Sequence, residues 1–121
     1  MHPYSIIIVV NELVIGSLLK ITIQKLYPTA HISIAVKAQD ALQLYQQSGA
    51  HLIITDKNIG TIDGLELTRT LRAWDVTLPI IVMSSDPTVE AAAKAAGATL
   101  FLSKPEIIRE LPAVLPQLLT P

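Results

Sequence analysis

The sequence predicts an α/β fold, a doubly wound parallel sheet with helices on both faces. Five short apolar runs, rich in Ile, Val and Leu, are separated by polar and turn-forming residues. Near-continuous apolar runs indicate strands that are buried on both faces, as in parallel sheets. Each run alternates with a stretch whose apolar residues recur at helical spacing. Strands and helices that alternate in this way build three layers, α/β/α.

The length and composition fit a single domain over residues 1–121. Half of the 121 residues are apolar and 16% are charged, which is enough to form a core and argues against disorder. The formal net charge of -1 gives no general attraction to nucleic acid or to an acidic membrane. The chain has no Cys, which excludes disulfides and thiolate metal sites. The first apolar run is too short for a signal peptide or a spanning helix, so we expect a cytoplasmic protein.

The first half of the chain is expected to hold three strands and two helices. In order they are a strand over Ser5–Val10, a helix over Leu13–Leu26, a strand over His31–Val36, a helix from Asp40 that stops at Gly49, and a strand over His51–Thr55. The second strand alternates apolar and polar residues, as at a sheet edge. Asn11 is a candidate cap for the first helix. The residues of that helix that recur at near-helical spacing, and whose packing must hold it, are Val14, Leu18, Ile21 and Leu26.

The second half is expected to hold two strands and three helices. In order they are a helix over Gly64–Trp74, a strand over Pro79–Met83, a helix over Val89–Ala96 after a cap at Asp86–Pro87, a strand over Ala98–Leu102, and a last helix. The last segment carries a helical stripe of apolar residues from Ile107 to Leu119. Pro112 and Pro116 lie inside it, and each removes a helical hydrogen bond at a cost of about 3 kcal/mol. We therefore expect a kinked or broken helix that still packs.

Polar side chains stand at the ends of four of the predicted strands. They are Asn11, Asp56, Ser84 and Lys104. The carboxyl ends of the strands meet at one edge of such a sheet, so a carboxylate, a hydroxyl and an ammonium are expected to converge there. A carboxylate can hold a phosphoryl group covalently, and phosphoryl transfer needs positive charge from a metal and a lysine around the phosphoryl oxygens. A nearby hydroxyl can respond to the new oxygens.

With these residues in this order and spacing, the chain resembles the receiver domain of two-component response regulators. The matching residues are Asp56 after an apolar strand, the pair Asp63–Gly64, the run Pro79–Ser85 and the run Gly97–Pro105. The resemblance covers essentially the whole chain. It implies a flavodoxin-like fold with strand order 2-1-3-4-5, and a signalling module that is not an enzyme.

The resemblance also implies roles for individual residues. Asp56 is the phosphoacceptor for a histidine kinase or a phosphotransfer protein, and Ser84 is the switch hydroxyl. Lys104 pairs with the phosphoryl group, and Lys104–Pro105 is expected to be a cis peptide. Phe101 occupies the aromatic switch position, although it also fits plain core packing. Phosphorylation is then expected to change a surface that a downstream protein partner or an output domain binds.

The chain departs from the family pattern at its first strand. The family keeps two acids there that help to hold Mg²⁺, and the matching residues here are Val10 and Asn11. Val10 has no ligating atom, and Asn11 offers one neutral oxygen. The implied metal ligands are thus Asp56, Asn11 and the backbone carbonyl of Asn58, and we expect weakened Mg²⁺ binding. Glu12 is the next acid and could turn toward the metal site, although its place at the helix start favours an outward direction.

Several functions remain open at this point. Besides the phosphoryl-accepting switch, the loss of the acid pair favours a degenerate receiver that binds partners independently of phosphorylation. A nucleotide-binding flavodoxin-like protein is a third class, but the segment from Asn11 to Gly16 holds one glycine and no phosphate-binding loop. We expect no membrane contact, and no direct nucleic-acid contact unless another domain supplies it. A homodimer is left open, although the prolines of the last helix weaken the family's dimer face.

Overall fold

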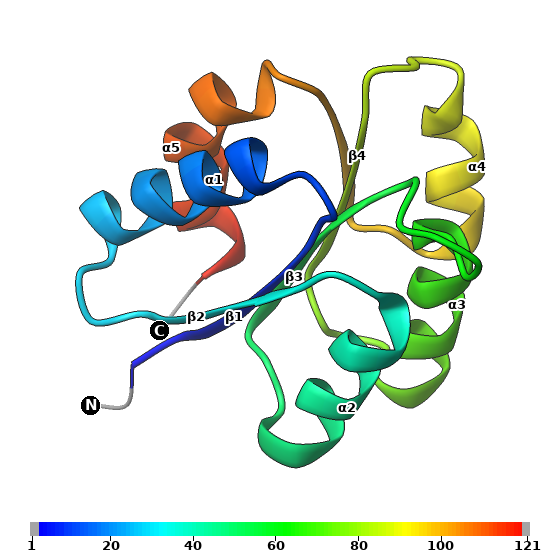
Figure 1. Ribbon diagram of the computed structural model, residues 1–121, viewed down its shortest axis with the longest axis horizontal. Coiled ribbons are helices and arrows are strands. Elements are labelled where there is room, and N and C mark those ends of the chain that lie inside the picture. Colours follow the sequence, from blue (N-terminus) through cyan, green and yellow to red (C-terminus); the bar gives the residue numbers. More distant parts are fainter. Residues whose placement is uncertain (1–2, 120–121) are drawn as a thin grey trace.

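The computed structural model describes residues 3–119, which form a five-stranded parallel sheet covered by helices on both faces (Figure 1). The strands are β1 (Ser5–Val9), β2 (His31–Ala35), β3 (Leu52–Asp56), β4 (Ile80–Ser84) and β5 (Leu100–Ser103). The helices are α1 (Leu13–Leu26), α2 (Ala38–Ser48), α3 (Gly64–Trp74), α4 (Val89–Ala96) and α5 (Ile107–Leu118). Residues 1, 2, 120 and 121, which the predicted single domain includes, lie outside the described residues. No helix within 3–119 has the length and apolar character needed to cross a membrane.

The strand order is β2-β1-β3-β4-β5, as predicted, and every neighbouring pair is parallel. The predicted elements are all present, with boundaries that differ by two residues at most. In the sheet, β2 lies beside β1 on one side and β3 lies beside β1 on the other side. The carboxyl ends of β1 and β3 therefore flank the point where the winding reverses, which is where open α/β sheets bind their ligands.

The two faces of the sheet pack against different helices. Helices α1 and α5 cover one face, and α2, α3 and α4 cover the other (Figure 1). Residues along a strand alternate between the two cores: in β3, Leu52 and Ile54 pack beside α1 and α5, whereas Ile53 packs on the opposite side. Both faces of the three central strands, β1, β3 and β4, are buried, which favours apolar residues at successive positions along them. This requirement explains the continuous apolar runs of the sequence.

Helix α1 packs with a face that the spacing of its apolar residues did not indicate. Its buried residues are Ile15, Gly16, Leu19 and Ile23. The four residues expected to pack, Val14, Leu18, Ile21 and Leu26, are 43–74% exposed, so that prediction is wrong. Because α1 is apolar around most of its circumference, spacing alone cannot select a face. Gly16 selects it: a Cβ there would lie 2.9 Å from Cγ2 of Val10, so only glycine permits this close approach to the sheet.

Two further predictions about the helices need correction. Glu12, not Asn11, occupies the cap position of α1, and it does so without a side-chain hydrogen bond to the first turn. Helix α5 runs from Ile107 to Leu118 although Pro112 and Pro116 lie inside it, so the helix is not broken, and the expected packing of its apolar stripe is confirmed. Both prolines are exposed, whereas the apolar stripe that contains Leu111 is buried. Burial of that stripe offsets the two missing hydrogen bonds, which are lost on the side of the helix where water can replace them.

Candidate functional site

Asp56 is the last residue of β3, the middle strand of the sheet, and it is only 2% exposed. Its Oδ1 accepts a hydrogen bond from the backbone N–H of Asn58 at 3.3 Å. Its Oδ2 accepts one from Nζ of Lys104 at 2.6 Å. A buried carboxylate is strongly unfavourable unless donors and a countercharge compensate for the lost water. The structure therefore places one paired, buried carboxylate at the carboxyl edge of the sheet.

The start of α3 supports the backbone of Asp56. Asp63 caps this helix, because its Oδ1 accepts two backbone N–H groups of the first turn at 3.0 and 2.9 Å. The N–H of Gly64 donates to the carbonyl of Lys57 at 2.7 Å, so α3 begins directly against the loop that follows Asp56. A Cβ on Gly64 would overlap the carbonyl oxygen of Asp56. The motif Asp63–Gly64 is thus explained by the structure: Asp63 caps α3, and position 64 requires glycine because a side chain there would collide with the backbone of Asp56.

Lys104 reaches Asp56 from the end of β5. Its backbone N–H donates to the carbonyl of Ser84 at 3.1 Å, and the expected cis peptide between Lys104 and Pro105 is confirmed. Its Nζ donates to Oδ2 of Asp56 at 2.6 Å and to Oε1 of Glu12 at 3.0 Å. Burial by itself lowers the pKa of Lys104, but the hydrogen bonds to Asp56 and Glu12 outweigh burial, and the net pKa is raised. The ammonium is therefore charged at neutral pH.

Glu12 is a site residue that the sequence left open but did not favour. Its carboxylate contacts Nζ of Lys104 at 3.0 Å, so the inward direction is the correct one and the favoured outward direction is wrong. Its side chain is 60% exposed, whereas that of Asp56 is 3% exposed. The available signal was topological, since β1 and β3 are neighbours and a long side chain just after β1 reaches the end of β3. The ammonium of Lys104 is thus shared by a buried carboxylate and an exposed one.

The expected metal ligands are only partly brought together. Asn11 is exposed, and Val10, which is 2% exposed, presents only hydrocarbon. Within residues 3–119 there is no group of three or more His, Cys, Asp or Glu side chains that could hold a metal ion. However, the ammonium of Lys104 is a cation that two carboxylates already hold. The carboxylate oxygens at this edge of the sheet therefore stabilise a positive charge.

Ser84 and Phe101 lie on the sheet face that α3 and α4 cover. Ser84 ends β4 and is 4% exposed, and its Oγ accepts the backbone N–H of Asp86 at 3.1 Å. Phe101 pairs with Val82, two residues before Ser84, and packs half-buried against the same core. Side chains at such diagonal positions on one face can reach each other. The structure thus brings Lys104 to Asp56 by direct contact and sets Ser84 at the end of the adjacent strand.

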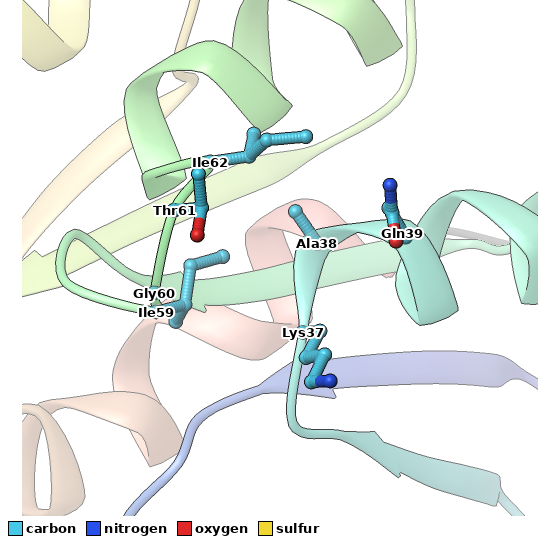
Figure 2. A pocket seen from close by; sticks show the side chains of 7 residues that line it. All are labelled: Lys37, Ala38, Gln39, Ile59, Gly60, Thr61 and Ile62. Carbon is cyan, nitrogen blue, oxygen red and sulfur yellow. The ribbon is translucent and has the colours of Figure 1, made fainter.

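A cavity of about 380 Å³ opens near this edge, between the start of α2 and the loop after β3 (Figure 2). Its lining residues are Lys37, Ala38, Gln39, Ile59, Gly60, Thr61 and Ile62. Of the described site residues, Asp56, Ser84 and Lys104 all lie outside this lining. Asp56 is therefore not at the base of this cavity, and a reactant has to reach it at the open edge of the sheet.

Comparison of the sequence with known proteins gives one family. The chain matches the family model described as the response regulator receiver domain over residues 6–115. It is 32% identical over 84 residues to the transcriptional regulatory protein PrrA of Mycobacterium leprae, a match that covers 68% of this chain and 36% of PrrA. The chain thus spans about a third of the length of that relative.

Solved receiver domains have the same fold. The signal receiver domain of an HD domain-containing protein from Pseudomonas fluorescens superposes with a TM-score of 0.87 at 26% identity, covering 97% of this chain and 94% of that one. The receiver domain of Ssk1 from Saccharomyces cerevisiae, crystallised with the histidine phosphotransfer protein Ypd1, gives a TM-score of 0.84 at 17% identity, covering 96% and 88%. The second likeness shows the fold alone. Because the family model covers nearly all of the sequence and the folds agree, this chain belongs to the receiver domain family of two-component response regulators.

Proposed function

We propose that this receiver domain accepts a phosphoryl group on Asp56 from a histidine kinase or a phosphotransfer protein. The observation that carries the proposal is the 2.6 Å contact between Nζ of Lys104 and Oδ2 of Asp56 at the carboxyl edge of the sheet. In the transfer, a bond forms between phosphorus and an Asp56 oxygen while the bond from phosphorus to the donor's histidine nitrogen breaks. Receiver domains are signalling modules and generally not enzymes, and we propose the same for this chain.

Lys104 supplies positive charge where the transfer requires it. Negative charge is spread over three phosphoryl oxygens in the transition state, and a fixed cation beside them lowers the barrier. The raised pKa of Lys104 keeps its ammonium charged at neutral pH. After transfer, the ammonium can move from the phosphorylated carboxylate of Asp56 to the phosphoryl oxygens, where it forms charge-assisted hydrogen bonds. Lys104 therefore serves both the transfer and the phosphorylated state.

Receiver domains generally bind Mg²⁺ at the phosphorylation site, and this chain is proposed to do so with reduced affinity. Asp56, Asn11 and the backbone carbonyl of Asn58 are the ligands that the family pattern leaves available. When bound, the ion neutralises charge on the phosphoryl oxygens. By the resemblance, Val10 and Asn11 stand in place of the family's acid pair, and each 1.4 kcal/mol of lost attraction weakens binding by about tenfold.

Ser84 and Phe101 are proposed to convert phosphorylation into movement. The Oγ of Ser84 accepts the N–H of Asp86, which stands in the turn that leads into α4. A phosphoryl group on the neighbouring strand adds acceptor oxygens that attract the hydroxyl of Ser84. A shift of Ser84 toward them changes the turn at Asp86 and the space beside Phe101. A downstream protein partner or an output domain would then bind the altered surface of α4 and β5.

The exposed start of α1 is proposed as the docking surface for the phosphoryl donor. Leu13 and Val14 are 81% and 74% exposed, and they directly follow Glu12, whose side chain contacts Lys104. A protein that brings a phosphoryl group to the buried Asp56 has to cover this edge of the sheet. Exposed apolar side chains at that place favour association, because covering them removes apolar surface from water.

Val14→Ser is expected to weaken binding of a phosphotransfer protein by about five- to tenfold, which corresponds to roughly 1 kcal/mol or slightly more. The donor must be one that phosphorylates the wild-type chain, and affinity is measured by titration calorimetry. Val76→Ser is the matched control, because Val76 is 80% exposed but lies in the α3–β4 connection, at the opposite edge of the sheet. Equal effects of the two substitutions would exclude the start of α1 as the docking surface.

The proposed acceptor role is tested by intact-mass measurement after incubation with acetyl phosphate and Mg²⁺. The wild-type chain is expected to gain one phosphoryl mass, which hydroxylamine removes because the adduct is an acyl phosphate. Asp56→Asn is expected to abolish the gain completely, since an amide is not a nucleophile of this kind. Asp40→Asn, which alters an exposed acid in the first turn of α2, is expected to retain it. An adduct that survives in Asp56→Asn would place the acceptor elsewhere.

A second candidate function is a protein-binding module that works without phosphorylation. It is favoured by the departure from the family pattern that the resemblance implies at Val10 and Asn11, of which Val10 is buried hydrocarbon. This function predicts that no donor, acetyl phosphate or protein, gives an adduct. It also predicts that Asp56→Asn binds downstream partners as the wild-type chain does.

A further inference from the structure

The cavity beside the start of α2 has no part in the proposed phosphoryl transfer. Its volume of about 380 Å³ lies within the range of cavities that hold a small molecule or a side chain of comparable size. Ile59 and Ile62 point from the loop after β3 toward Ala38 at the start of α2, so these walls of the cavity are apolar (Figure 2). The cavity therefore favours an apolar occupant about as large as an aromatic ring system.

An exposed aromatic pair lies at the other end of the same two helices. Trp74, the last residue of α3, is 46% exposed. Its ring stacks on that of Tyr45 in α2, with 6.1 Å between the ring centroids and 26° between the ring planes. The stack restricts the indole to one direction, so a partner that binds it loses little conformational freedom. Tryptophan is also enriched among the residues that dominate the binding energy of protein interfaces.

We propose that the face formed by α2, α3 and the β3–α3 loop binds a second copy of this chain, with the Trp74 indole of each copy seated in the cavity of the other. Both helices connect parallel strands and run in the same direction, so the cavity lies at their amino ends and Trp74 at their carboxyl ends. A two-fold axis across the middle of α3 makes the helices of the two copies antiparallel and forms the same contact twice. Such a dimer forms independently of phosphorylation at Asp56.

The charges on α3 fit the same arrangement. Glu66 and Arg69 are exposed, and within residues 3–119 neither side chain forms a salt bridge. The midpoint between these two residues in the sequence is also the midpoint between Trp74 and Thr61, which lines the cavity. A single antiparallel register therefore brings Trp74 to the cavity and places Glu66 beside Arg69 of the other copy. The two opposite charges complement each other across the axis.

The extent of this face sets the expected affinity. Helices α2 and α3 have 11 residues each, so each is only about 16 Å long. Small interfaces of this kind form weak and transient complexes, and we expect a dissociation constant of about 10–100 μM. The dimer is therefore expected to dissociate on dilution, within a range of concentrations that solution measurements reach.

The dimer is tested by sedimentation velocity and tryptophan fluorescence of the unphosphorylated full chain over a dilution series. Trp74 is the one tryptophan of the sequence, so the emission reports on its surroundings alone. In the wild-type chain, dissociation and a shift of the emission to longer wavelength are expected at the same concentration. Trp74→Ala is expected to weaken dimerisation by about tenfold or more. Leu13→Ala, which shortens an 81% exposed side chain on α1, is the control and is expected to dimerise as the wild type does.

Exchange of the two charges on α3 tests the register while Trp74 stays in place. Glu66→Arg and Arg69→Glu are each expected to weaken the dimer by about three- to tenfold, because like charges then meet across the axis. The two changes combined are expected to restore the wild-type affinity. Glu90→Arg is the matched control, since Glu90 is also an exposed acid in the first turn of a helix, α4.

Four results would overturn the inference. They are a wild-type chain that stays monomeric at about 1 mM, a dimer whose formation leaves the Trp74 emission unchanged, a dimer that Trp74→Ala does not weaken, and charge changes that do not compensate each other. A monomeric chain whose cavity binds a small molecule or a different protein would fall under the first of these. No phosphoryl donor is present, so none of these results bears on the acceptor role of Asp56.

Discussion

Lys104→Met is expected to lower the free energy of unfolding by about 2–4 kcal/mol at neutral pH, somewhat below the cost of breaking a fully buried ion pair because Lys104 is partly exposed. The physical reason is that the carboxylate of Asp56, 2% exposed, would lose the ammonium that lies 2.6 Å from Oδ2 and would remain buried without its countercharge. Only the N–H of Asn58, at 3.3 Å, then remains as a described donor to the carboxylate. Urea denaturation of the two proteins measures the difference.

The pH dependence of this effect has a definite sign. The folded-state pKa of Lys104 is raised, because its hydrogen bonds to Asp56 and Glu12 outweigh the effect of burial. The stability that Lys104 contributes is therefore complete below its unfolded-state pKa of about 10.4 and is lost as the pH rises through the folded-state value. The difference between wild type and Lys104→Met should accordingly be constant around neutral pH and should shrink in strong alkali.

A double-mutant cycle separates the ion pair from other effects of the substitution. Asp56→Asn combined with Lys104→Met is expected to be more stable than Lys104→Met alone, since the second change removes the unpaired buried charge. Asp56→Asn alone is expected to have a smaller effect, because Lys104 keeps its contact with Glu12. Strictly additive free-energy changes would contradict the account of Asp56 and Lys104 as a coupled pair.

Gly64→Ala is expected to cost about 3 kcal/mol or more, at the upper end of what added volume costs in a packed site. The new Cβ would overlap the carbonyl oxygen of Asp56 and lie 3.0 Å from the Cα of Lys57. Both neighbours are backbone atoms, so relief requires that the end of β3 or the start of α3 moves. The variant should therefore also lose phosphoryl uptake, because a shift of the Asp56 backbone displaces its carboxylate from Lys104. Thermal unfolding and intact-mass measurement check the two effects.

Gly60→Ala, in the same loop, is the control for Gly64→Ala. Gly60 has a φ of 107°, which costs a non-glycine residue about 1–2 kcal/mol, but nothing lies within 4 Å of a Cβ at that place. We expect a moderate loss of stability and retained phosphoryl uptake. If Gly60→Ala were as harmful to uptake as Gly64→Ala, close packing against Asp56 would not be the reason for glycine at position 64.

The sequence predicted the sheet well because its signals are local to each strand. Runs such as Leu52–Ile54 are apolar at every position, and only a strand that is covered on both faces requires this pattern. The helical face of α1 could not be predicted in the same way. Apolar residues surround this helix, and the choice of face depends on how closely Gly16 can approach Val10, a contact between separate elements.

The candidate site was predicted as a set of residues but not as a set of contacts. Strand ends indicated that Asp56 and Lys104 would share an edge, because all parallel strands end on the same side. The part played by Glu12 depends on a side-chain direction that helix position alone misjudged. Its carboxylate turns toward Lys104 because a charged lysine stands across the end of β3, and that lysine lies 92 residues away in the chain.

The most direct test of the account is an NMR titration of the wild-type chain with beryllofluoride, a mimic of the phosphoryl group, in the presence of Mg²⁺. The account predicts saturable changes at the backbone amides of Asp56, Ser84 and Phe101, all absent in Asp56→Asn. Changes at Ser84 and Phe101 would show that a group bound at Asp56 alters the structure of the neighbouring strands β4 and β5. An unchanged spectrum at saturating beryllofluoride and Mg²⁺ would contradict the phosphoryl-accepting switch and would favour a module that binds its partners without phosphorylation.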